Sequence, residues 1–224
     1  MNIAFHPAPG RSRGDIQMVM LPGAGFAPGD FAERGFVRAA QKCGAAVDVA
    51  VASPDFDHYL DQTLVADLRR ELEACGWART SPRLWLLGIS LGGMGALLYA
   101  QAYAAEIEGV VLLAPYLGTT GTVAEVARAG GFGSWQPGEI AAADGERRLL
   151  GWLQAHTAAE AVRPMLYLGY GRGDRFVQGQ ALLAERLPPD RVMVAEGGHD
   201  WDVWARLWRE FLARAPFTAG RGER

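Results

Sequence analysis

The sequence predicts an α/β fold with a mostly parallel central sheet of about six to seven strands, flanked by helices on both faces. Three observations lead to this prediction. Short apolar runs alternate with amphipathic, helix-length segments along most of the chain. The stretch Leu84-Trp-Leu-Leu-Gly-Ile-Ser-Leu-Gly-Gly-Met-Gly-Ala96 links an apolar run to a helix start through a glycine-rich turn. The 224 residues suit one large domain, and neither an internal repeat nor a low-complexity linker divides them, so we expect a single domain over 1–224.

The first half of the chain contains the N-terminal strands and helices. We expect, in order, a short edge strand at 2–5, a strand at 16–21, a helix over about 31–43, a strand at 46–52 and a helix over 59–75. Asp30 is placed to cap the first helix. The second helix has Leu60, Leu64, Leu68 and Leu72 at a spacing of four.

The second half resumes the alternation after an interruption. We expect a strand at 83–88, a helix at 91–105 and a strand at 110–113, and later a strand at 165–168, a helix at 178–186, a strand at 191–195 and a helix at 201–214. Residues 116–162 break this rhythm with many glycines and two helix-like pieces, at about 122–129 and 138–155. An insertion at this point is predicted to form a small cap over a site, and residues 218–224 are expected to be a flexible tail.

Composition excludes several classes of protein. The formal net charge is −3, with no basic block, which argues against nucleic acid or an anionic membrane as the main partner. No run reaches the roughly 20 apolar residues of a membrane helix, and residues 1–14 do not resemble a signal peptide, so we expect a cytoplasmic protein. Cys43 and Cys75 each lie near the end of a predicted helix and are expected to be buried thiols, with a disulfide as the alternative. Neither has metal-ligand spacing with the other or with a histidine.

The Gly-x-Ser-x-Gly turn formed by Gly88, Ser90 and Gly92 indicates a nucleophile elbow, a sharp strand-to-helix turn that exposes a serine hydroxyl above the sheet. A serine in a strained backbone conformation leaves no room for Cβ atoms two residues to either side. Gly93 and Gly95 would let the following helix pack close to neighbouring strands. The motif alone is weak, so a base, an acid and an oxyanion hole must be found elsewhere.

Asp174 and His199 are the candidates for the acid and the base. Both follow predicted strands, so with Ser90 they would gather at the carboxyl edge of a parallel sheet, in the chain order Ser, Asp, His. His199 follows two glycines that permit a tight loop, whereas His6, His58 and His156 fit the role less well. The alternatives are a helix-capping histidine and a solvated loop aspartate, and Asp200 and Asp202 compete for the role of the acid.

The oxyanion hole is expected to consist of two backbone N–H groups. The elbow supplies one from Leu91, and the loop Pro22-Gly-Ala-Gly-Phe26 supplies the other, from Ala24 or Gly25. Ala24 is preferred because glycine flanks it on both sides. A phosphate-binding loop is the alternative, but the full Gly-x-Gly-x-x-Gly pattern is missing.

Four aromatic residues are candidates for the substrate pocket by position: Phe26, Tyr116, Trp135 and Trp201. Trp204 and Trp208 continue a helical stripe from Trp201 and are expected in the core. Arg172 and Arg175 flank Asp174 and are interpreted as solvated loop charges.

The chain resembles the α/β-hydrolase superfamily in Leu-Pro-Gly-Ala-Gly (21–25), Leu-Gly-Ile-Ser-Leu-Gly-Gly (87–93), the loop with Asp174, and Gly-Gly-His-Asp-Trp (197–201). The last segment is similar to that of small esterases. The resemblance implies an ester-type hydrolase with no metal and no organic cofactor. Pro22 stands where many relatives have histidine, which alters the pocket wall but leaves the backbone donors, and the first strands of the sheet look short or absent.

These residues predict a serine hydrolase that cleaves a small or short-chain carboxylic ester through an acyl-enzyme, with a small-molecule ester as its partner. A thioesterase or acyltransferase would use the same triad. A non-catalytic ligand-binding receptor, a haloperoxidase or a C–C bond hydrolase could use the same scaffold.

Overall fold

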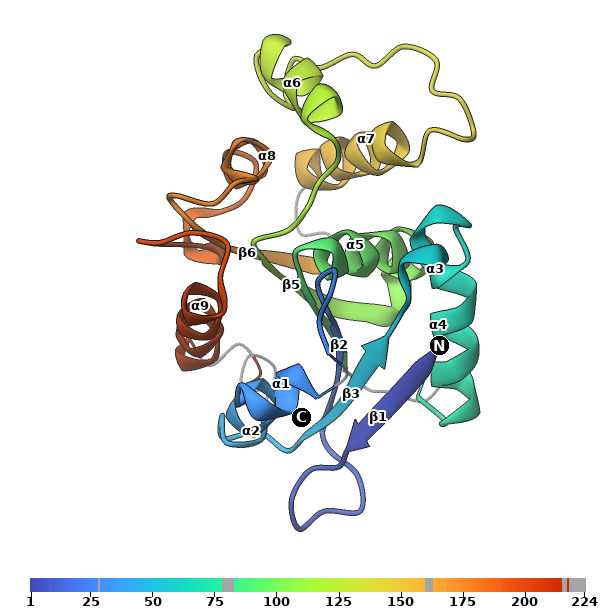
Figure 1. Ribbon diagram of the computed structural model, residues 1–224, viewed down its shortest axis with the longest axis vertical. Helices are drawn as coiled ribbons and strands as arrows, with labels where there is room; N and C mark the ends of the chain where they lie inside the picture. The colour runs from blue at the N-terminus through green and yellow to red at the C-terminus, as the bar shows by residue number, and fades with distance from the viewer. Residues whose placement is uncertain (28, 78–82, 160–162, 215–216, 218–224) are drawn as a thin grey trace.

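The computed structural model describes residues 1–27, 29–77, 83–159, 163–214 and 217. Within them, one seven-stranded sheet has the order β1-β3-β2-β4-β5-β6-β7 (Figure 1). The strands are β1 (Asn2–His6), β2 (Ile16–Leu21), β3 (Val47–Ser53), β4 (Leu84–Ile89), β5 (Ile107–Leu113), β6 (Met165–Gly171) and β7 (Val192–Ala195). Only β1 in this sheet runs antiparallel to its neighbour; the described pairs from β3 to β7 are parallel. The predicted fold class is confirmed.

The helices connect these strands. They are α1 (Asp30–Glu33), α2 (Phe36–Gln41), α3 (Phe56–Leu60), α4 (Leu64–Ala74), α5 (Leu91–Tyr103), α6 (Thr120–Arg128), α7 (Gly145–Ala158), α8 (Val177–Ala184) and α9 (Trp201–Ala213), with 3-10 turns at Ala104–Glu106 and Pro189–Arg191.

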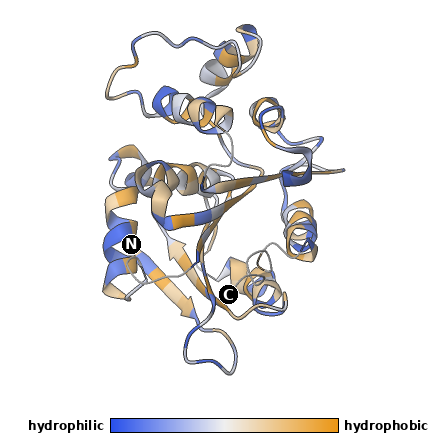
Figure 2. Ribbon diagram, turned by 180° about the vertical axis from the view of Figure 1, so that it is seen from behind, coloured by the Kyte–Doolittle hydropathy of each residue, from blue (hydrophilic) through white to orange (hydrophobic). Residues whose placement is uncertain are grey.

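The sheet separates two apolar cores, because successive strand residues point to opposite faces. In β2, Val19 and Leu21 face the core formed with α4, α5, α7 and α8, whereas Met18 and Met20 face the core formed with α1, α2 and α9. Every residue of β2 is therefore buried, and its residues are apolar apart from Gln17. Figure 2 shows apolar residues along the central strands.

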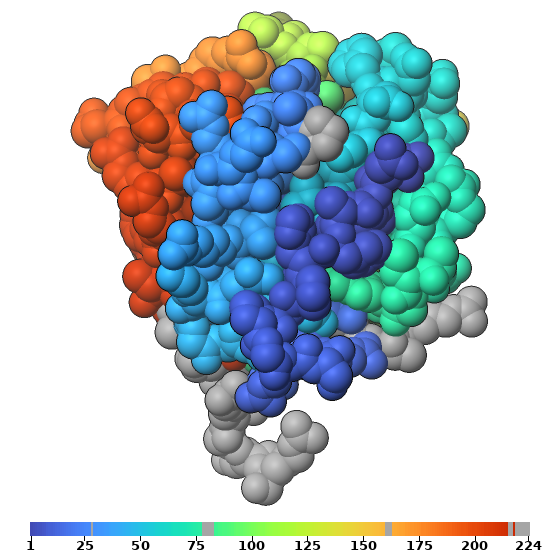
Figure 3. All heavy atoms as spheres, turned by 60° about the horizontal axis from the view of Figure 1, so that its bottom comes forward, coloured from blue at the N-terminus to red at the C-terminus, as the bar shows by residue number. Residues whose placement is uncertain are grey.

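The N-terminal strand, β1, lies at one edge of the sheet. Asn2 pairs with Ser53 and His6 with Val49. Figure 3 shows the N-terminal residues on the outside of the molecule, between the α1–α2 segment and the α3–α4 segment. Asp48 accepts hydrogen bonds from Ala8 N and Gly14 N, both at 2.8 Å, and these tie the loop after β1 to β3.

Two helices predicted as continuous are each broken. The helix expected over 31–43 is split into α1 and α2 by Gly35, whose φ of 79° is left-handed. The helix expected over 59–75 is split into α3 and α4 near Gln62, with φ of 57°. The break removes Leu60 from the buried stripe of α4 and leaves it 63% exposed. Cys75, expected to be buried, is exposed at the end of α4, whereas Cys43 is half-buried; both are free thiols.

The segment between β5 and β6 carries α6 and α7, and the last residues of the predicted insertion, 160–162, lie outside the described residues. α7 begins at Gly145, later than expected, because Asp144 caps it by accepting from Arg147 N. Leu149, Leu150 and Leu153 of α7 are buried in the core shared with α5. Thus α7 helps to cover the sheet, while α6 lies farther from it (Figure 1).

None of the described helices is long and apolar enough to cross a membrane. The predicted flexible tail, 218–224, lies outside the described residues.

Candidate active site

Ser90 occupies the turn between β4 and α5 in a strained conformation. Its φ of 54° and ψ of −118° lie outside the regions that residues with a side chain normally adopt. Both of its backbone polar groups are anchored, since Ser90 N donates to Leu113 O at 3.0 Å and Ser90 O accepts from Tyr116 N at 2.9 Å. The side chain is therefore held at the carboxyl end of the sheet, 7% exposed.

The glycines around Ser90 are required by close backbone contacts. A Cβ at Gly88 would overlap the backbone of Gly92, and one at Gly92 would overlap the carbonyl groups of Leu21 and Pro22. A Cβ at Gly93 would lie 2.8 Å from Pro115 Cβ. The elbow thus packs directly against the ends of β2 and β5, as the sequence predicts.

Ser90, His199 and Asp174 lie in a hydrogen-bonded row. His199 Nε2 is 2.9 Å from Ser90 Oγ, and His199 Nδ1 is 2.8 Å from Asp174 Oδ2. The Asp174 side chain is fully buried and that of His199 is 10% exposed. The three residues follow β4, β6 and β7, so the parallel sheet brings their loops together at one edge.

Glycines allow the loops of Asp174 and His199 to bind each other. Gly173 N donates to Gly197 O at 2.9 Å, and Arg172 N donates to Ala195 O at 2.9 Å. A Cβ at Gly171 would overlap the Gly197 carbonyl, and Gly197 has φ of 120°. This backbone contact sets the spacing between the carboxylate and the imidazole.

Asp174 has two further hydrogen-bond donors that the sequence did not reveal. Phe176 N donates to Oδ1 at 2.8 Å, and Gln180 Nε2 donates to the same oxygen at 3.2 Å. The competing carboxylate, Asp200, instead caps α9 by accepting from the amides of Asp202 and Val203. The geometry therefore favours Asp174 as the partner of His199.

The predicted oxyanion donors lie beside Ser90. Leu91 is the first residue of α5, so its N–H has no acceptor within the helix. The backbone of Gly23 lies against the elbow, since a Cβ there would be 3.3 Å from Ser90 Cβ. Ala24 follows directly, and Gly25 turns the loop with φ of 78°. The loop after β2 and the start of α5 thus lie close to the serine, and the roles of Leu91 and Ala24 as donors stay a prediction.

The aromatic candidates Phe26 and Trp201 form one wall near the site. Their ring centroids are 4.3 Å apart, and both are half-buried. Trp204, expected only in the core, also contacts the His199 ring edge-on at 5.0 Å, and Phe176 does so at 5.1 Å. The imidazole therefore has edge-on contacts with two aromatic rings. No sequence motif marked Phe176, because its role depends on the turn after β6.

Tyr116 lies between the elbow and α7. Its hydroxyl donates to Glu146 Oε1 at 3.0 Å, and its ring packs edge-on against Phe176. Burial and the neighbouring Glu146 carboxylate raise the pKa of Tyr116 to about 12. The residue is thus neutral and hydrogen-bonded at neutral pH, and it is half-buried.

Trp135 does not fit its predicted place in the pocket. It is 3% exposed, and its indole Nε1 donates to Glu125 Oε1 at 2.9 Å. The ring belongs to the core that includes α7. The prediction failed because the position of the residue within 116–162 carries no information about which way the ring faces.

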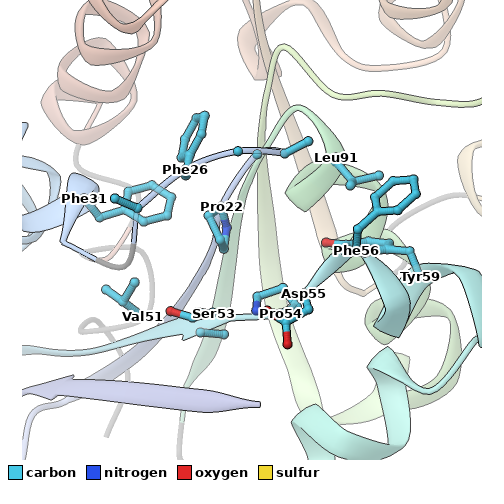
Figure 4. Close-up of a pocket in the computed structure, with 15 residues that line it drawn as sticks. Pro22, Phe26, Phe31, Val51, Ser53, Pro54, Asp55, Phe56, Tyr59 and Leu91 are labelled. Carbon is cyan, nitrogen blue, oxygen red and sulfur yellow. The ribbon is translucent and has the colours of Figure 1, made fainter.

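Two cavities lie on the α3 side of the elbow. The smaller, of about 230 Å³, is bounded by the Pro22–Ala27 loop, the end of β3 and Leu91 (Figure 4). Figure 4 shows Pro22 and Phe26 on one side and Phe56, Tyr59 and Leu91 on the other. The larger, of about 590 Å³, lies between α3, α4, α5 and the start of α7, and His58 is on its wall. Because Leu91 and Ala24 line the smaller cavity, it adjoins the predicted oxyanion hole.

No group of three or more potential metal-ligating side chains occurs among the described residues. The polar groups gathered around Ser90 are those of proton transfer and anion stabilisation.

The structure is similar to several solved serine hydrolases. Est1E from Butyrivibrio proteoclasticus aligns with a TM-score of 0.63 and 15% identity, covering 96% of this chain and 93% of that one. An S-formylglutathione hydrolase from Agrobacterium tumefaciens aligns with a TM-score of 0.61 and 14% identity, covering 94% and 87%. A monoacylglycerol lipase from Paleococcus ferrophilus aligns with a TM-score of 0.56 and 18% identity, covering 95% and 98%.

The chain has the α/β-hydrolase fold. Residues 51–142 of the chain match the family model described as serine aminopeptidase, S33. A search of curated protein sequences finds no match. Because the structural matches have low identity, they establish the fold, and the chemistry must be argued from the site.

Proposed function

We propose that this α/β hydrolase is a serine esterase that cleaves carboxylic esters through an acyl-enzyme. The observation that carries the proposal is the row of contacts from Ser90 Oγ to His199 at 2.9 Å and from His199 to Asp174 at 2.8 Å. A serine hydroxyl needs a neighbouring base to act as a nucleophile, and that base needs an acceptor that holds its tautomer.

In the proposed reaction, His199 Nε2 takes the proton of Ser90 as Oγ attacks the ester carbonyl carbon. The N–H groups of Leu91 and Ala24, with Gly25 as the alternative to Ala24, stabilise the resulting oxyanion. The tetrahedral intermediate collapses, the bond to the alcohol oxygen breaks, and His199 returns the proton to that oxygen. Water then attacks the acyl-enzyme by the same route and releases the acid and free Ser90.

The position of His199 indicates where the alcohol and the acyl group of the ester would lie in the site. The alcohol must lie on the His199 side, where Nε2 can protonate it, so the acyl group extends toward the loop after β2. The cavity there has about 230 Å³, room for roughly eight groups of the size of a water molecule. This volume supports a short acyl chain, and Phe26, Trp201 and Tyr116 are proposed to line the entrance.

The test combines turnover of p-nitrophenyl acetate with covalent labelling by a fluorophosphonate. We expect native protein to turn over the ester and to be labelled on Ser90. Ser90→Ala should abolish labelling and lower kcat by several orders of magnitude, because the triad acts as a unit. Ser134→Ala, at an exposed serine in the same chain, is the matched control and should behave like native protein. A native protein that is not labelled would overturn the proposal.

Substrate panels separate the alternatives that share this site. Faster cleavage of acetyl than of palmitoyl esters supports the short-chain assignment, and the reverse result contradicts it. A coenzyme A thioester preferred over the matching oxygen ester would indicate a thioesterase. Binding of an ester without turnover would instead indicate a receptor on a hydrolase scaffold.

A further inference from the structure

Gln180 is a fully buried polar side chain next to the candidate active site. It lies on α8 with 0% exposure, behind Asp174 as seen from His199. Its Nε2 donates to Asp174 Oδ1 at 3.2 Å and to the backbone carbonyl of Pro115 at 3.4 Å. An amide at a fully buried position is unusual, since such positions are normally apolar.

The chemistry of its neighbours determines the orientation of the amide. A carboxylate oxygen and a carbonyl oxygen are both acceptors, so only the NH₂ end of Gln180 can face them. The opposite end, Oε1, has no hydrogen-bond partner among the described residues. A buried unpaired carbonyl is unfavourable for stability. The amide is therefore better explained by its hydrogen bond to Asp174 than by a contribution to the stability of the fold.

Gln180 and the other donor reach Asp174 from different elements. Phe176 N also donates to Asp174 Oδ1 at 2.8 Å, but it lies only two residues farther along the same turn, so this bond does not connect Asp174 to another element. Gln180 reaches the carboxylate from a helix and simultaneously holds Pro115, which packs on Gly93 of the elbow helix. It thus connects the loop of the acid to the segment that contacts Ser90.

We propose that Gln180 is a positioning residue, which holds the Asp174 carboxylate with Oδ2 toward His199 and fixes its place relative to Ser90. The inference rests on the proposed serine hydrolase function. With Oδ1 held by two donors, Oδ2 is the oxygen left to accept from His199 Nδ1. The tautomer of His199 that can accept the Ser90 proton is thereby favoured.

The test is Gln180→Met, which keeps the length of the side chain and removes the donor. Leu183→Met is the matched control, because Leu183 lies on the same helix with 0% exposure and does not contact the acid. We expect Gln180→Met to lower kcat by about 10- to 100-fold, the factor expected for one hydrogen bond to a charged group. KM should stay unchanged, since Gln180 does not touch the pocket. Leu183→Met should keep the native kcat.

Labelling with a fluorophosphonate separates positioning from a loss of folded protein. In Gln180→Met we expect full labelling of one site per chain at a rate reduced by the same factor as kcat, with a melting temperature equal to or above the native value. A reduced labelled fraction with a native rate per labelled site would overturn the proposal, because it would mean that Gln180 only supports folding. If Gln180→Met does not fold, Gln180→Asn is used, since its shorter amide cannot reach Oδ1.

A proton resonance provides a measurement that does not depend on turnover. The downfield resonance of His199 Nδ1–H reports its bond to Asp174, and we expect it to shift or broaden in Gln180→Met. An unchanged resonance together with native kcat would contradict the positioning role. Native protein that neither turns over esters nor reacts with the fluorophosphonate would contradict the serine hydrolase function instead, and the resonance would still test Gln180.

Discussion

Replacing Asp174 with asparagine tests the proposed proton transfer most directly. In the native site, Phe176 N and Gln180 Nε2 both donate to Asp174 Oδ1. An asparagine side chain must keep its carbonyl oxygen at that position, since an NH₂ group there would face two donors. Its NH₂ group is then directed at His199 Nδ1. His199 must accept at Nδ1 and carry its proton on Nε2, where it can no longer take a proton from Ser90.

The size of the expected fall in kcat follows because His199 loses the tautomer that can accept the Ser90 proton, while the site keeps its shape. We expect kcat of Asp174→Asn to fall by about 10⁴-fold, which corresponds to about 5 kcal/mol of lost transition-state stabilisation. KM should change little. The melting temperature should stay near the native value, because both donors to Oδ1 remain satisfied.

The assay is steady-state hydrolysis of p-nitrophenyl acetate by native protein, Asp174→Asn and Asp174→Ala. The kcat of Asp174→Asn should be no higher than that of Asp174→Ala, although asparagine is closer in shape to aspartate. Asp200→Ala is the control, since it removes the N-cap of α9 and should cost about 1 kcal/mol of stability while preserving most of kcat. The reasoning is refuted if Asp174→Asn keeps more than about a tenth of native kcat, or if Asp200→Ala has the larger effect on kcat.

Three further predictions concern the scaffold. Gly92→Ala should destabilise the fold by several kcal/mol in chemical denaturation, because its Cβ would overlap the Leu21 carbonyl; a near-native midpoint would contradict that contact. Tyr59→Phe should raise the melting temperature by about 2–4 °C, because the buried Tyr59 hydroxyl has no hydrogen-bond partner among the described residues; a clear decrease would mean that the hydroxyl is paired. Burial opposes ionisation of Glu146, but hydrogen bonds from the Thr119 amide and from nearby hydroxyls outweigh it and keep the pKa of Glu146 below its usual value of 4.5. Glu146→Gln should therefore be less stable than native protein at neutral pH. This difference in stability should shrink as the pH falls from 4.5 through the lower folded pKa of Glu146. A difference in stability that does not depend on pH would contradict this prediction.

Local sequence predicted the elements that depend on local rules. The strands at 16–21 and 84–89 are buried throughout and, apart from Gln17, apolar, because both faces of the sheet are covered, and this leaves a clear signal. The glycines at 88 and 92 mark the elbow because only glycine fits where backbones touch. The chain order of Ser90, Asp174 and His199 then follows from where strands end.

The errors lie where long-range contacts outweigh local preference. The predicted helices break at Gly35, between α1 and α2, and at Gln62, between α3 and α4, and Gln62 carries no sequence signal of its left-handed backbone. Trp135 packs in the interior with its indole Nε1–H donating a hydrogen bond to Glu125 Oε1, a pairing that its sequence position does not reveal. Cys75 ends a helix whose buried face does not include it.

The sequence by itself determined the alternation of strands and helices, the strained turn at Ser90, and the residue types available at each strand end. These features arise from side-chain periodicity and from the backbone freedom of glycine, which act over a few residues. Tertiary structure alone decided that Gln180 donates to Oδ1 of Asp174 and that Trp204 and Phe176 contact the His199 ring. It also decided that Trp135 lies in the core, away from the pocket. Such contacts join residues from separate elements, and only the packing of those elements sets the direction in which each side chain points.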